Sequence, residues 1–416
     1  MISIRELRVS GLEAGAPTSI DLLLSVEAPI VFEPDLELEV VGAGGELARS
    51  RLRDQLDVGW LPRGSFRFRA LSGALWQRAG PARVRVAASH AHAGTRTAAG
   101  EASASVVVEG DAAGDGPPQL SWQAGSEPGA PEPGSLSWSK GHGDWFFRHF
   151  DHAARTIISY MLGDSPLLRG RILDVGCGDG ITDLGIALRC QPELLLGVDP
   201  FEGYQRLPSI LEANGLDRSV LPACLRFAPF DANHLPFPDD SFDVVLSWGS
   251  LEHIAGGHLQ ALREIKRVLR PDGLLFAHPG LYYSNPGHHL GEFSDEPFFH
   301  LKRPREELRR FVLSTTPRYM DRSGEFATPE QYWQWFEELN RITVSSFEAE
   351  LRALEFEPWR VAIRTEERIE YTPELLSYPM QDLATGELYL SCINRKRPRP
   401  DGFRLLDPAS VESTLR

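Results

Sequence analysis

The sequence has 416 residues, of which 43 are Lys or Arg and 58 are Asp or Glu, so its formal net charge is −15. This acidic balance disfavours a nucleic-acid partner, because nucleic-acid binding depends on clustered cationic side chains. No segment approaches the roughly 20 apolar residues of a membrane-spanning helix, and the start of the chain lacks the apolar core of a secretory signal. The four cysteines, at positions 177, 190, 224 and 392, show neither disulfide nor metal spacing. We therefore expect a soluble, reduced, cytoplasmic protein with more than one domain.

Residues 1–110 show the alternation of apolar and polar residues that is typical of β-strands with one exposed face. The alternating segments are 20–26, 36–41, 66–69, 82–86 and 103–108, separated by turns rich in Gly, Pro and Asp. Short strands at this spacing predict an antiparallel, all-β sandwich. Arginines recur on the polar faces of these strands, where they are either solvated or available to a ligand.

Residues 111–139 are rich in Gly, Pro, Ser, Ala and Glu. A segment of this composition buries too little apolar surface to order itself, so we expect a disordered or extended linker. A helical pattern starts at Asp144, and a second domain extends over residues 140–395. The tail 396–416 is basic and rich in proline near its start, and we expect it to be mobile.

The second domain is organised around the segment 171–180. Its apolar run 172–175 predicts a buried parallel strand. Glycines at 176, 178 and 180 then predict a tight turn ahead of a helix over 181–189. Glycine suits this turn because it adopts positive φ and leaves room for a ligand beside the backbone. The N–H groups at the start of the helix favour a polar or anionic ligand group.

Three later segments carry the features of a doubly wound α/β fold. A strand over 194–198 ends at Asp199, and in such folds an acid at this place binds the ribose hydroxyls of an adenosine ligand. The turn 230–233 places Asp231 ahead of a strand over 243–247. A helix over 262–270 ends at a Pro-Asp-Gly turn and leads into a strand over 274–278.

With these motifs, residues 140–395 resemble a class I S-adenosylmethionine-dependent methyltransferase, which carries L-D-x-G-C-G-x-G and L-R-P-x-G signatures. The resemblance implies a doubly wound, Rossmann-like, seven-stranded α/β domain with an antiparallel last strand, preceded here by the all-β sandwich. It also implies S-adenosylmethionine as the cofactor, with the glycines at its methionine part, Asp199 at the ribose, and Asp231 and the Ala232 N–H at the adenine. The full set of cofactor-binding residues implied in this way is Asp174, Gly176, Gly178, Gly180, Asp199, Pro200, Asp231, Ala232 and Trp248.

Methyl transfer to a neutral hydroxyl requires a base, and candidates follow the fourth and fifth strands of the domain. We expect His278 to be the base with a carboxylate orienting it, and Glu252 and His253 to be the other catalytic residues. Similar sugar O-methyltransferases pair a histidine after strand four with an aspartate ending strand five, so the order is inverted here and the roles stay open. His253 could instead be a helix-start residue, and His278 could be a hydrogen-bonding residue of the core.

Residues 281–343 are an insertion into the minimal fold. Because ligands bind outside the carboxyl ends of parallel strands, the insertion predicts a lid or an acceptor pocket. The expected substrate-binding residues are Trp145, Arg148 and His149, ahead of the glycine-rich turn, and His288 and His289 in the lid. A divalent metal held by His288, His289 and Glu292 is an alternative that we do not expect, because their spacing is not diagnostic.

The sequence thus predicts an O-methyltransferase for a sugar hydroxyl, carried by a bacterial surface polysaccharide or its precursor. The N-terminal domain contributes to this hypothesis, since its strand rhythm and its turn 78–84 resemble the carbohydrate-binding sandwich of polysaccharide export transporters. The expected partners are a glycan or small-molecule hydroxyl acceptor and the polysaccharide assembly machinery. Three alternatives remain: a methyltransferase for a secondary metabolite or quinone, a glycan-binding assembly protein with an inactive methyltransferase domain, and a nucleotide-sugar oxidoreductase. The G-x-G-x-G spacing disfavours the last.

Overall fold

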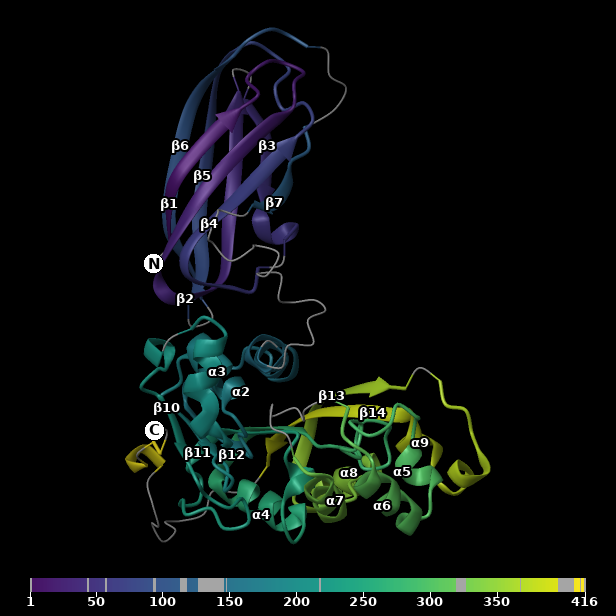
Figure 1. Ribbon diagram of the computed structural model, residues 1–416. Helices are drawn as coiled ribbons and strands as arrows, with labels where there is room; N and C mark the ends of the chain where they lie inside the picture. Colours follow the sequence, from purple (N-terminus) through teal and green to yellow (C-terminus); the bar gives the residue numbers. More distant parts are fainter. Residues whose placement is uncertain are drawn as a thin grey trace. The chain divides into compact units, whose positions relative to one another are not determined.

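The computed structural model describes the chain except for residues 1, 43–44, 57, 93–94, 113–117, 126–145, 147, 217, 319–326, 367, 396–407, 412 and 415–416. The chain divides into two compact units (Figure 1). The first unit holds Met1–His152 with Leu188–Cys190 and Pro208–Leu221, and the second holds Ala153–Ala187, Gln191–Leu207 and Pro222–Arg416.

The first unit is built mainly of long antiparallel strands (Figure 1). These are β1 (Ile2–Ser10), β2 (Thr18–Gly42), β3 (Gly45–Arg51), β4 (Trp60–Ser72), β5 (Gly80–His92), β6 (Thr95–Val108) and β7 (Ser121–Gly125). A 3-10 turn, Leu52–Asp54, follows β3. The segments 20–26 and 36–41, predicted as two strands, are both parts of β2.

The 25-residue strand β2 organises this unit. Its first part pairs with β1 and β4, and its second part pairs with β3 and β5. Since β5 continues to β6 and β4 to β7, one seven-stranded sheet results. Leu22, Leu24, Leu38 and Val40 alternate along β2, are at most 1% exposed and share one core. The predicted antiparallel β-domain is confirmed, but β2 joins the two sheets that a sandwich would keep separate.

Part of the predicted linker belongs to this sheet. Residues 121–125 form β7 and pair with β4. Trp122 is 4% exposed within the core, and its Nε1 donates a hydrogen bond to Ser50 Oγ at 3.0 Å. The linker prediction is therefore wrong for these residues, because one buried tryptophan supplies apolar surface that the average composition hides. Residues 113–117 and 126–139 lie outside the described part of the chain.

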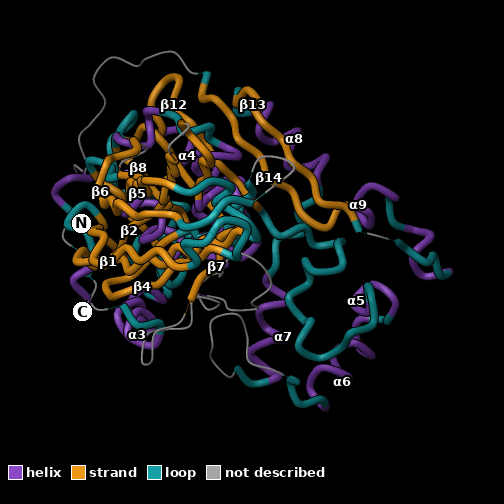
Figure 2. The backbone as a smooth tube through the Cα atoms, turned by 90° about the horizontal axis from the view of Figure 1, so that it is seen from above, coloured by secondary structure: helices purple, strands orange, loops and turns teal. Residues whose placement is uncertain are grey.

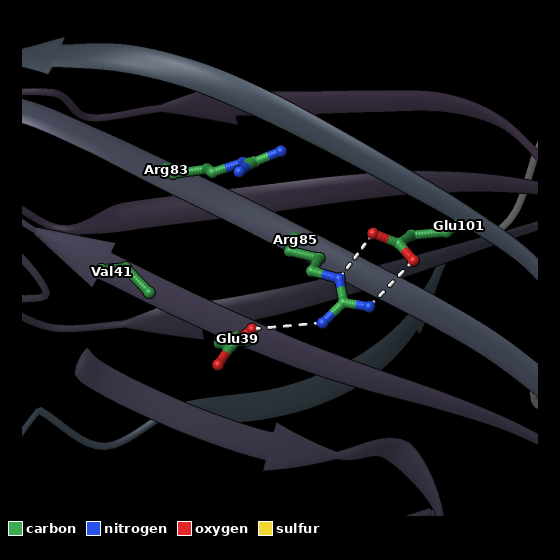
Figure 3. Close-up of a pocket in the computed structure, with 5 residues that line it drawn as sticks. All are labelled: Glu39, Val41, Arg83, Arg85 and Glu101. Atoms are coloured by element: carbon green, nitrogen blue, oxygen red, sulfur yellow. Dashed lines mark hydrogen bonds and ion pairs between the residues drawn. The ribbon is translucent and has the colours of Figure 1, made fainter. Parts of the chain in front are cut away.

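The polar face of the sheet carries paired charges. Arg85 on β5 lies between Glu101 of β6 and Glu39 of β2 (Figure 3). Its Nε and Nη2 donate to Glu101 at 2.5 and 2.9 Å, and these hydrogen bonds, with the charge of Glu101, raise the pKa of Arg85. Arg83 and Val41 complete the rim of this shallow pocket. The charge of Arg85 is balanced by Glu101 and Glu39 of the same sheet. A solvated sheet face is therefore a simpler interpretation of these arginines than a ligand-binding surface.

The second unit contains a seven-stranded sheet in the order β10-β9-β8-β11-β12-β14-β13. Its strands are β8 (Arg171–Val175), β9 (Leu194–Val198), β10 (Leu225–Ala228), β11 (Phe242–Trp248), β12 (Leu269–His278), β13 (Phe356–Thr365) and β14 (Thr385–Asn394). The first five are parallel, and β14 runs antiparallel between β12 and β13. The doubly wound, Rossmann-like prediction and its antiparallel last strand are confirmed.

Helices and turns connect these strands. The helices outside the insertion are α2 (Ile181–Cys190), α3 (Leu207–Ala213), α4 (His258–Val268), α8 (Val344–Ala353) and α9 (Met380–Ala384). The π-helical and 3-10 segments are Arg148–Ala153, Thr156–Met161, Pro166–Arg169, Gly203–Arg206, Arg218–Val220, Leu251–His253, Pro373–Ser377 and Pro408–Ser410. In α4, Ala261, Leu262, Ile265 and Val268 are fully buried and recur at helical spacing, so one apolar face joins the core beside the sheet.

The insertion after β12 is a helical layer with its own core. It contains α5 (Phe299–Lys302), α6 (Arg305–Ser314) and α7 (Pro329–Glu338), which Figure 2 shows grouped together outside the strands. Thr328 begins α7 as a capping box with Gln331, as its sequence favours. Tyr332, Trp333 and Phe336 are at most 8% exposed. Most aromatic residues of the insertion therefore pack on one another instead of lining an open pocket.

The end of the C-terminal tail packs against the edge strand β10. Val411 is 6% exposed in the main core, and its carbonyl accepts a hydrogen bond from Arg226 at 2.9 Å. The Thr414 N–H donates to the Phe227 carbonyl at 2.9 Å. The prediction of a mobile tail is thus wrong for these residues, while 396–407 lie outside the described part of the chain.

The cysteines are free thiols, as their spacing predicts. Among the described residues, no helix combines the length and the apolar character that crossing a membrane requires.

Candidate active site

The glycine-rich turn lies between β8 and α2. Gly176, Gly178 and Gly180 have φ of 78°, 55° and 71°, a region that residues with a Cβ rarely adopt. A Cβ on Gly176 would collide with the Ser250 side chain, and one on Gly180 would lie 2.5 Å from the Phe227 ring. A Cβ on Gly178 would meet nothing within 4 Å. The turn therefore packs tightly against its neighbours and leaves space beside Gly178 for a ligand.

Asp199, directly after β9, borders this space. Its Oδ2 accepts a hydrogen bond from the Gly178 N–H at 3.1 Å, and its Oδ1 accepts one from the Phe201 N–H at 2.8 Å. Burial raises the pKa of Asp199, and these two hydrogen bonds offset part of the rise. Each carboxylate oxygen can accept a further hydrogen bond, so Asp199 can hold the two vicinal hydroxyls of a ribose. Pro200, which follows, is exposed.

Asp174 and Asp183 form a buried carboxyl pair under the turn. They are 3% and 0% exposed, and Asp174 Oδ1 and both Asp183 oxygens have no other hydrogen-bond partner among the described residues. Burial raises the pKa of Asp174 to about 7, with a hydrogen bond from Asp183 opposing the rise and the charge of Asp199 adding to it. Burial and the charge of Asp174 hold the pKa of Asp183 well above its usual range. The pair therefore shares a proton, and a cationic ligand group nearby would favour its release.

The turn after β10 carries Asp231 and Ala232, the residues implied to bind the adenine. The Asn233 N–H donates to Asp231 Oδ1 at 2.8 Å, which fixes the turn after β10. Ala232 is 8% exposed. The carboxylate of Asp231 is exposed to solvent, and its contact with a nucleoside base stays a prediction.

The turn after β11 lies against the glycine-rich turn. Ser250 Oγ donates a hydrogen bond to the Val175 carbonyl at 2.7 Å and lies 2.7 Å from Ser247 Oγ. The Gly249 N–H donates to the His278 carbonyl at 2.8 Å. These bonds hold the carboxyl ends of β8, β11 and β12 together at one edge of the sheet.

At this edge the structure brings Glu252, His253 and His289 together. Glu252 is 2% exposed, and its Oε1 lies 3.6 Å from His289 Nε2 and 3.9 Å from His253 Nε2. Burial would raise the pKa of Glu252. The nearby imidazoles of His289 and His253 and the Gly280 N–H outweigh it and hold the pKa at about 2. The two predicted catalytic residues thus meet a predicted substrate-binding histidine.

His278, the predicted base, ends β12. Its Nδ1 donates a hydrogen bond to the Leu388 carbonyl at 2.8 Å, and because a carbonyl only accepts, Nε2 of the neutral ring carries the lone pair. The ring stacks on Tyr389 at 4.3 Å between centroids and meets Trp248 edge-on at 4.7 Å. A backbone carbonyl therefore orients the His278 ring through Nδ1. Trp248, implied to bind the cofactor, packs beside this histidine.

The remaining predicted residues lie apart from this cluster. His288 is 4% exposed, accepts a hydrogen bond from the Leu290 N–H at 3.0 Å and packs on His300. This burial argues against contact with an acceptor, and Glu292 does not join the cluster of His289 that the structure forms. Arg148 and His149 belong to the other compact unit, so their role stays a prediction. Trp145 lies outside the described residues.

Three residues at the site were not predicted from the sequence. Tyr389 had no motif to mark it. Asp183 carried a signal, since it lies in the first turn of α2, where a solvated acid is the usual interpretation. Asn340 anchors the turn after β11, since its N–H donates to the Glu252 carbonyl at 2.7 Å and its Nδ2 to the Leu251 carbonyl at 2.8 Å. Only the folded chain brings residue 340 next to residue 252.

Parts of the chain are similar to known proteins. Residues 173–277 match the family model described as methyltransferase domain. The chain is 32% identical over 139 residues to 27-O-demethylrifamycin SV methyltransferase of Amycolatopsis mediterranei, covering 32% of this chain and 48% of the relative. It is 36% identical over 106 residues to a fatty-acid O-methyltransferase of Mycolicibacterium smegmatis, covering 25% and 34%. A solved structure of a putative S-adenosylmethionine-dependent methyltransferase from Listeria monocytogenes aligns with 15% identity and a TM-score of 0.37, over 59% of this chain and 99% of that one.

Residues 173–277 of the second unit thus match a methyltransferase domain, for which S-adenosylmethionine is the cofactor. The residues at its carboxyl edge fit that cofactor, because Asp199 can take the ribose, the space beside Gly178 is open, and Asp174 offers an orphaned oxygen in the buried acid pair. The chain spans less than half the length of the curated relatives it matches.

We predict that Asp199→Ala weakens binding of S-adenosylhomocysteine by roughly tenfold or more, because it leaves the ribose hydroxyls without their acceptor. Calorimetric titration measures the affinity. Glu370→Ala, at an exposed acid of the same unit, serves as control and should bind as the unaltered protein does. Equal affinity in both variants would remove Asp199 from the site.

We predict also that Asp183→Asn flattens the pH dependence of stability. The pKa of Asp174 is raised to about 7, so the folded protein holds a proton that the unfolded chain loses near pH 4. Stability therefore falls as the pH rises from about 4 to about 7. Asp183→Asn removes one acid of the pair, so the variant should be more stable than the parent at pH 8. Urea unfolding followed by the helical circular dichroism signal from pH 5 to 8 measures this, and two superimposable profiles would contradict a shared proton.

Proposed function

We propose that the protein is an S-adenosylmethionine-dependent O-methyltransferase whose acceptor is a sugar hydroxyl. The observation that carries the proposal is the meeting of three groups at one sheet edge: the Asp199-bordered glycine turn, His278 with its proton on Nδ1, and the polar cluster at Glu252. This edge offers a cofactor cradle and a base in the same methyltransferase domain.

The cofactor supplies a methyl group on a positively charged sulfur, and the chain has to align it with an acceptor. Alignment of two reactants can contribute ~7–11 kcal/mol to the lowering of the barrier. The turns after β8, β9 and β11 are tied to one another by backbone and side-chain hydrogen bonds, so the cradle is pre-organised. Rigid placement of the reactants is therefore the main contribution expected of this chain.

A hydroxyl acceptor loses its proton during transfer, and under this proposal His278 Nε2 takes it. A placed base contributes ~10²–10⁴-fold to the rate. The Leu388 carbonyl keeps the ring in the tautomer with its proton on Nδ1, and Tyr389 holds the plane of the ring.

Polar groups around the edge support a polyhydroxylated acceptor. His289 and the exposed His253 present imidazoles there, and the buried Glu252 carboxylate lies within 3.9 Å of both. Such groups suit hydrogen bonding to a sugar better than contact with a purely apolar molecule. Under this proposal the acceptor belongs to a surface polysaccharide or its precursor, the enzyme works in the cytoplasm with the assembly machinery, and the N-terminal unit binds glycan.

The names of two relatives favour a second candidate, a small-molecule hydroxyl acceptor. One relative is a demethylrifamycin methyltransferase and the other a fatty-acid O-methyltransferase. In that case the N-terminal unit is a scaffold. Transfer of labelled methyl groups from S-adenosylmethionine to a polysaccharide extract, to free sugars, and to phenols and fatty acids separates the two. Label in the polysaccharide or sugars supports the proposal, and label confined to the phenols or fatty acids overturns its sugar part.

We predict that His278→Ala keeps the affinity for S-adenosylhomocysteine but loses ~10²–10⁴-fold of turnover at saturating acceptor. His278→Asn is the matched variant, because its amide can still donate to the Leu388 carbonyl. Both variants should be slow if the ring is the base. Full turnover in His278→Asn would show that the hydrogen bond to Leu388 is the function of the residue.

A further inference from the structure

We infer that Glu252, His253 and His289 form a binding site for a divalent transition-metal ion. Each residue can offer one ligand atom, and the three atoms lie within 4.8 Å of one another. Two ligands about 2.1 Å from a tetrahedral ion lie roughly 3.4 Å apart. The 3.6 Å between Glu252 Oε1 and His289 Nε2 is near this value, and the 3.9 Å to His253 Nε2 requires a small rotation of an exposed side chain.

A second observation is that the buried carboxylate of Glu252 can accept more hydrogen bonds than it receives. The side chain is 2% exposed, and its Oε2 has no hydrogen-bond partner among the described residues. A buried carboxylate oxygen without a partner is costly. An ion between the two histidines and this carboxylate would supply the missing partner, because a carboxylate can bind a metal through one or both of its oxygens.

The backbone around the cluster is shaped to hold it. A Cβ on Gly280 would lie 2.6 Å from Glu252 Oε1, so a side chain at this position would displace the carboxylate from where it lies. His289 has φ of 52°, a conformation that costs a non-glycine residue free energy and is common at functional sites. Asn340 ties down the turn that carries Glu252 and His253. These features indicate a built site that goes beyond a chance meeting of surface side chains.

The ligand set selects the class of ion. Two imidazoles and one carboxylate suit Zn²⁺, Mn²⁺ and related first-row ions, whereas Mg²⁺ prefers oxygen ligands. Only three protein ligands converge in the described part of the chain. A three-ligand site leaves positions open for an exchangeable ligand, as catalytic metal sites do.

The role of the ion rests on the proposed function. An acceptor hydroxyl bound to a divalent ion loses its proton more readily. The proton of the hydroxyl passes to His278, the oxygen lone pair forms the new bond to the methyl carbon, and the pair of the broken C–S bond stays on sulfur. The ion is unchanged, and the products are the methyl ether, S-adenosylhomocysteine and a proton.

Metal titration tests the site without reference to any acceptor. The full chain, purified without a histidine tag and stripped with EDTA, is titrated calorimetrically with ZnCl₂, MnCl₂ and MgCl₂. We expect one Zn²⁺ per chain at this site, weaker Mn²⁺ and much weaker Mg²⁺, following the usual order for such ligands. Absence of Zn²⁺ and Mn²⁺ binding would overturn the inference.

Substitutions test whether the ion binds at these residues. Glu252→Gln and His289→Gln should weaken Zn²⁺ binding by at least ~10–100-fold, because loss of an outer-shell partner alone costs that much. The control is His234→Gln, at an exposed His–Asp pair of 3.9 Å to which no third ligand comes close in the described part of the chain, and its affinity should stay unchanged. Unchanged affinity in the two cluster variants would place the ion elsewhere, for example on a free cysteine, and overturn the assignment.

Two further readouts separate this inference from the proposed function. Turnover should be lost on stripping and return with Mn²⁺ or Zn²⁺, while affinity for S-adenosylhomocysteine stays the same. Metal binding with undiminished turnover after stripping would refute the role at the acceptor. Failure to bind S-adenosylhomocysteine in any metal state would refute the proposed function, and the titrations would still decide the metal site.

Discussion

The hydrogen bond from the Gly178 N–H to the Asp199 carboxylate joins the ends of two neighbouring parallel strands, and the candidate site depends on it. It can form only because the turn after β8 holds three glycines with positive φ. The same turn accepts the close approach of Ser250, which brings the end of β11 beside it. The glycine-rich turn, His278 and the cluster at Glu252 thus share one edge of the sheet because their strands are parallel and adjacent.

Negative charge is concentrated at this edge in a form that suits a cationic cofactor. Asp199 borders the open space, and the Asp174–Asp183 pair lies buried beneath the turn with one shared proton. Glu252 stays ionised because the two histidines and the Gly280 N–H stabilise its charge. A sulfonium and an ammonium group are favoured in such a field. After methyl transfer the sulfur is neutral, so the same field favours the product less than the substrate.

The local patterns of the sequence were sufficient to predict the Rossmann-like fold of the second unit. Strand ends at Asp174 and Asp199 and the glycines between them follow short-range rules of period and turn chemistry, and all lie where those rules place them. The failures came from long-range contacts. Trp122 and Val411 are buried apolar residues in segments of largely polar composition, and each packs on a sheet whose strands are distant in sequence. Composition averages cannot show such contacts.

The candidate site, like the fold, could be predicted only where local sequence patterns mark its residues. His278, Glu252 and His253 could be found because they follow strand ends, but their partners could not. Leu388 orients His278 through its backbone carbonyl, which carries no residue-specific signal. His289 reaches Glu252 from an insertion of irregular structure, whereas the neighbouring His288 turns into the core. Which of two adjacent histidines joins the site depends on a backbone conformation that the sequence pattern does not specify.

The central claim is that an adenosyl cofactor occupies the space between the glycine-rich turn and Asp199. Calorimetric titration of the full chain with S-adenosylhomocysteine, and separately with NAD, tests it most directly. The account predicts saturable binding of one S-adenosylhomocysteine per chain and no binding of NAD. Binding of NAD, or no heat from either ligand under conditions in which the protein is folded, would contradict it.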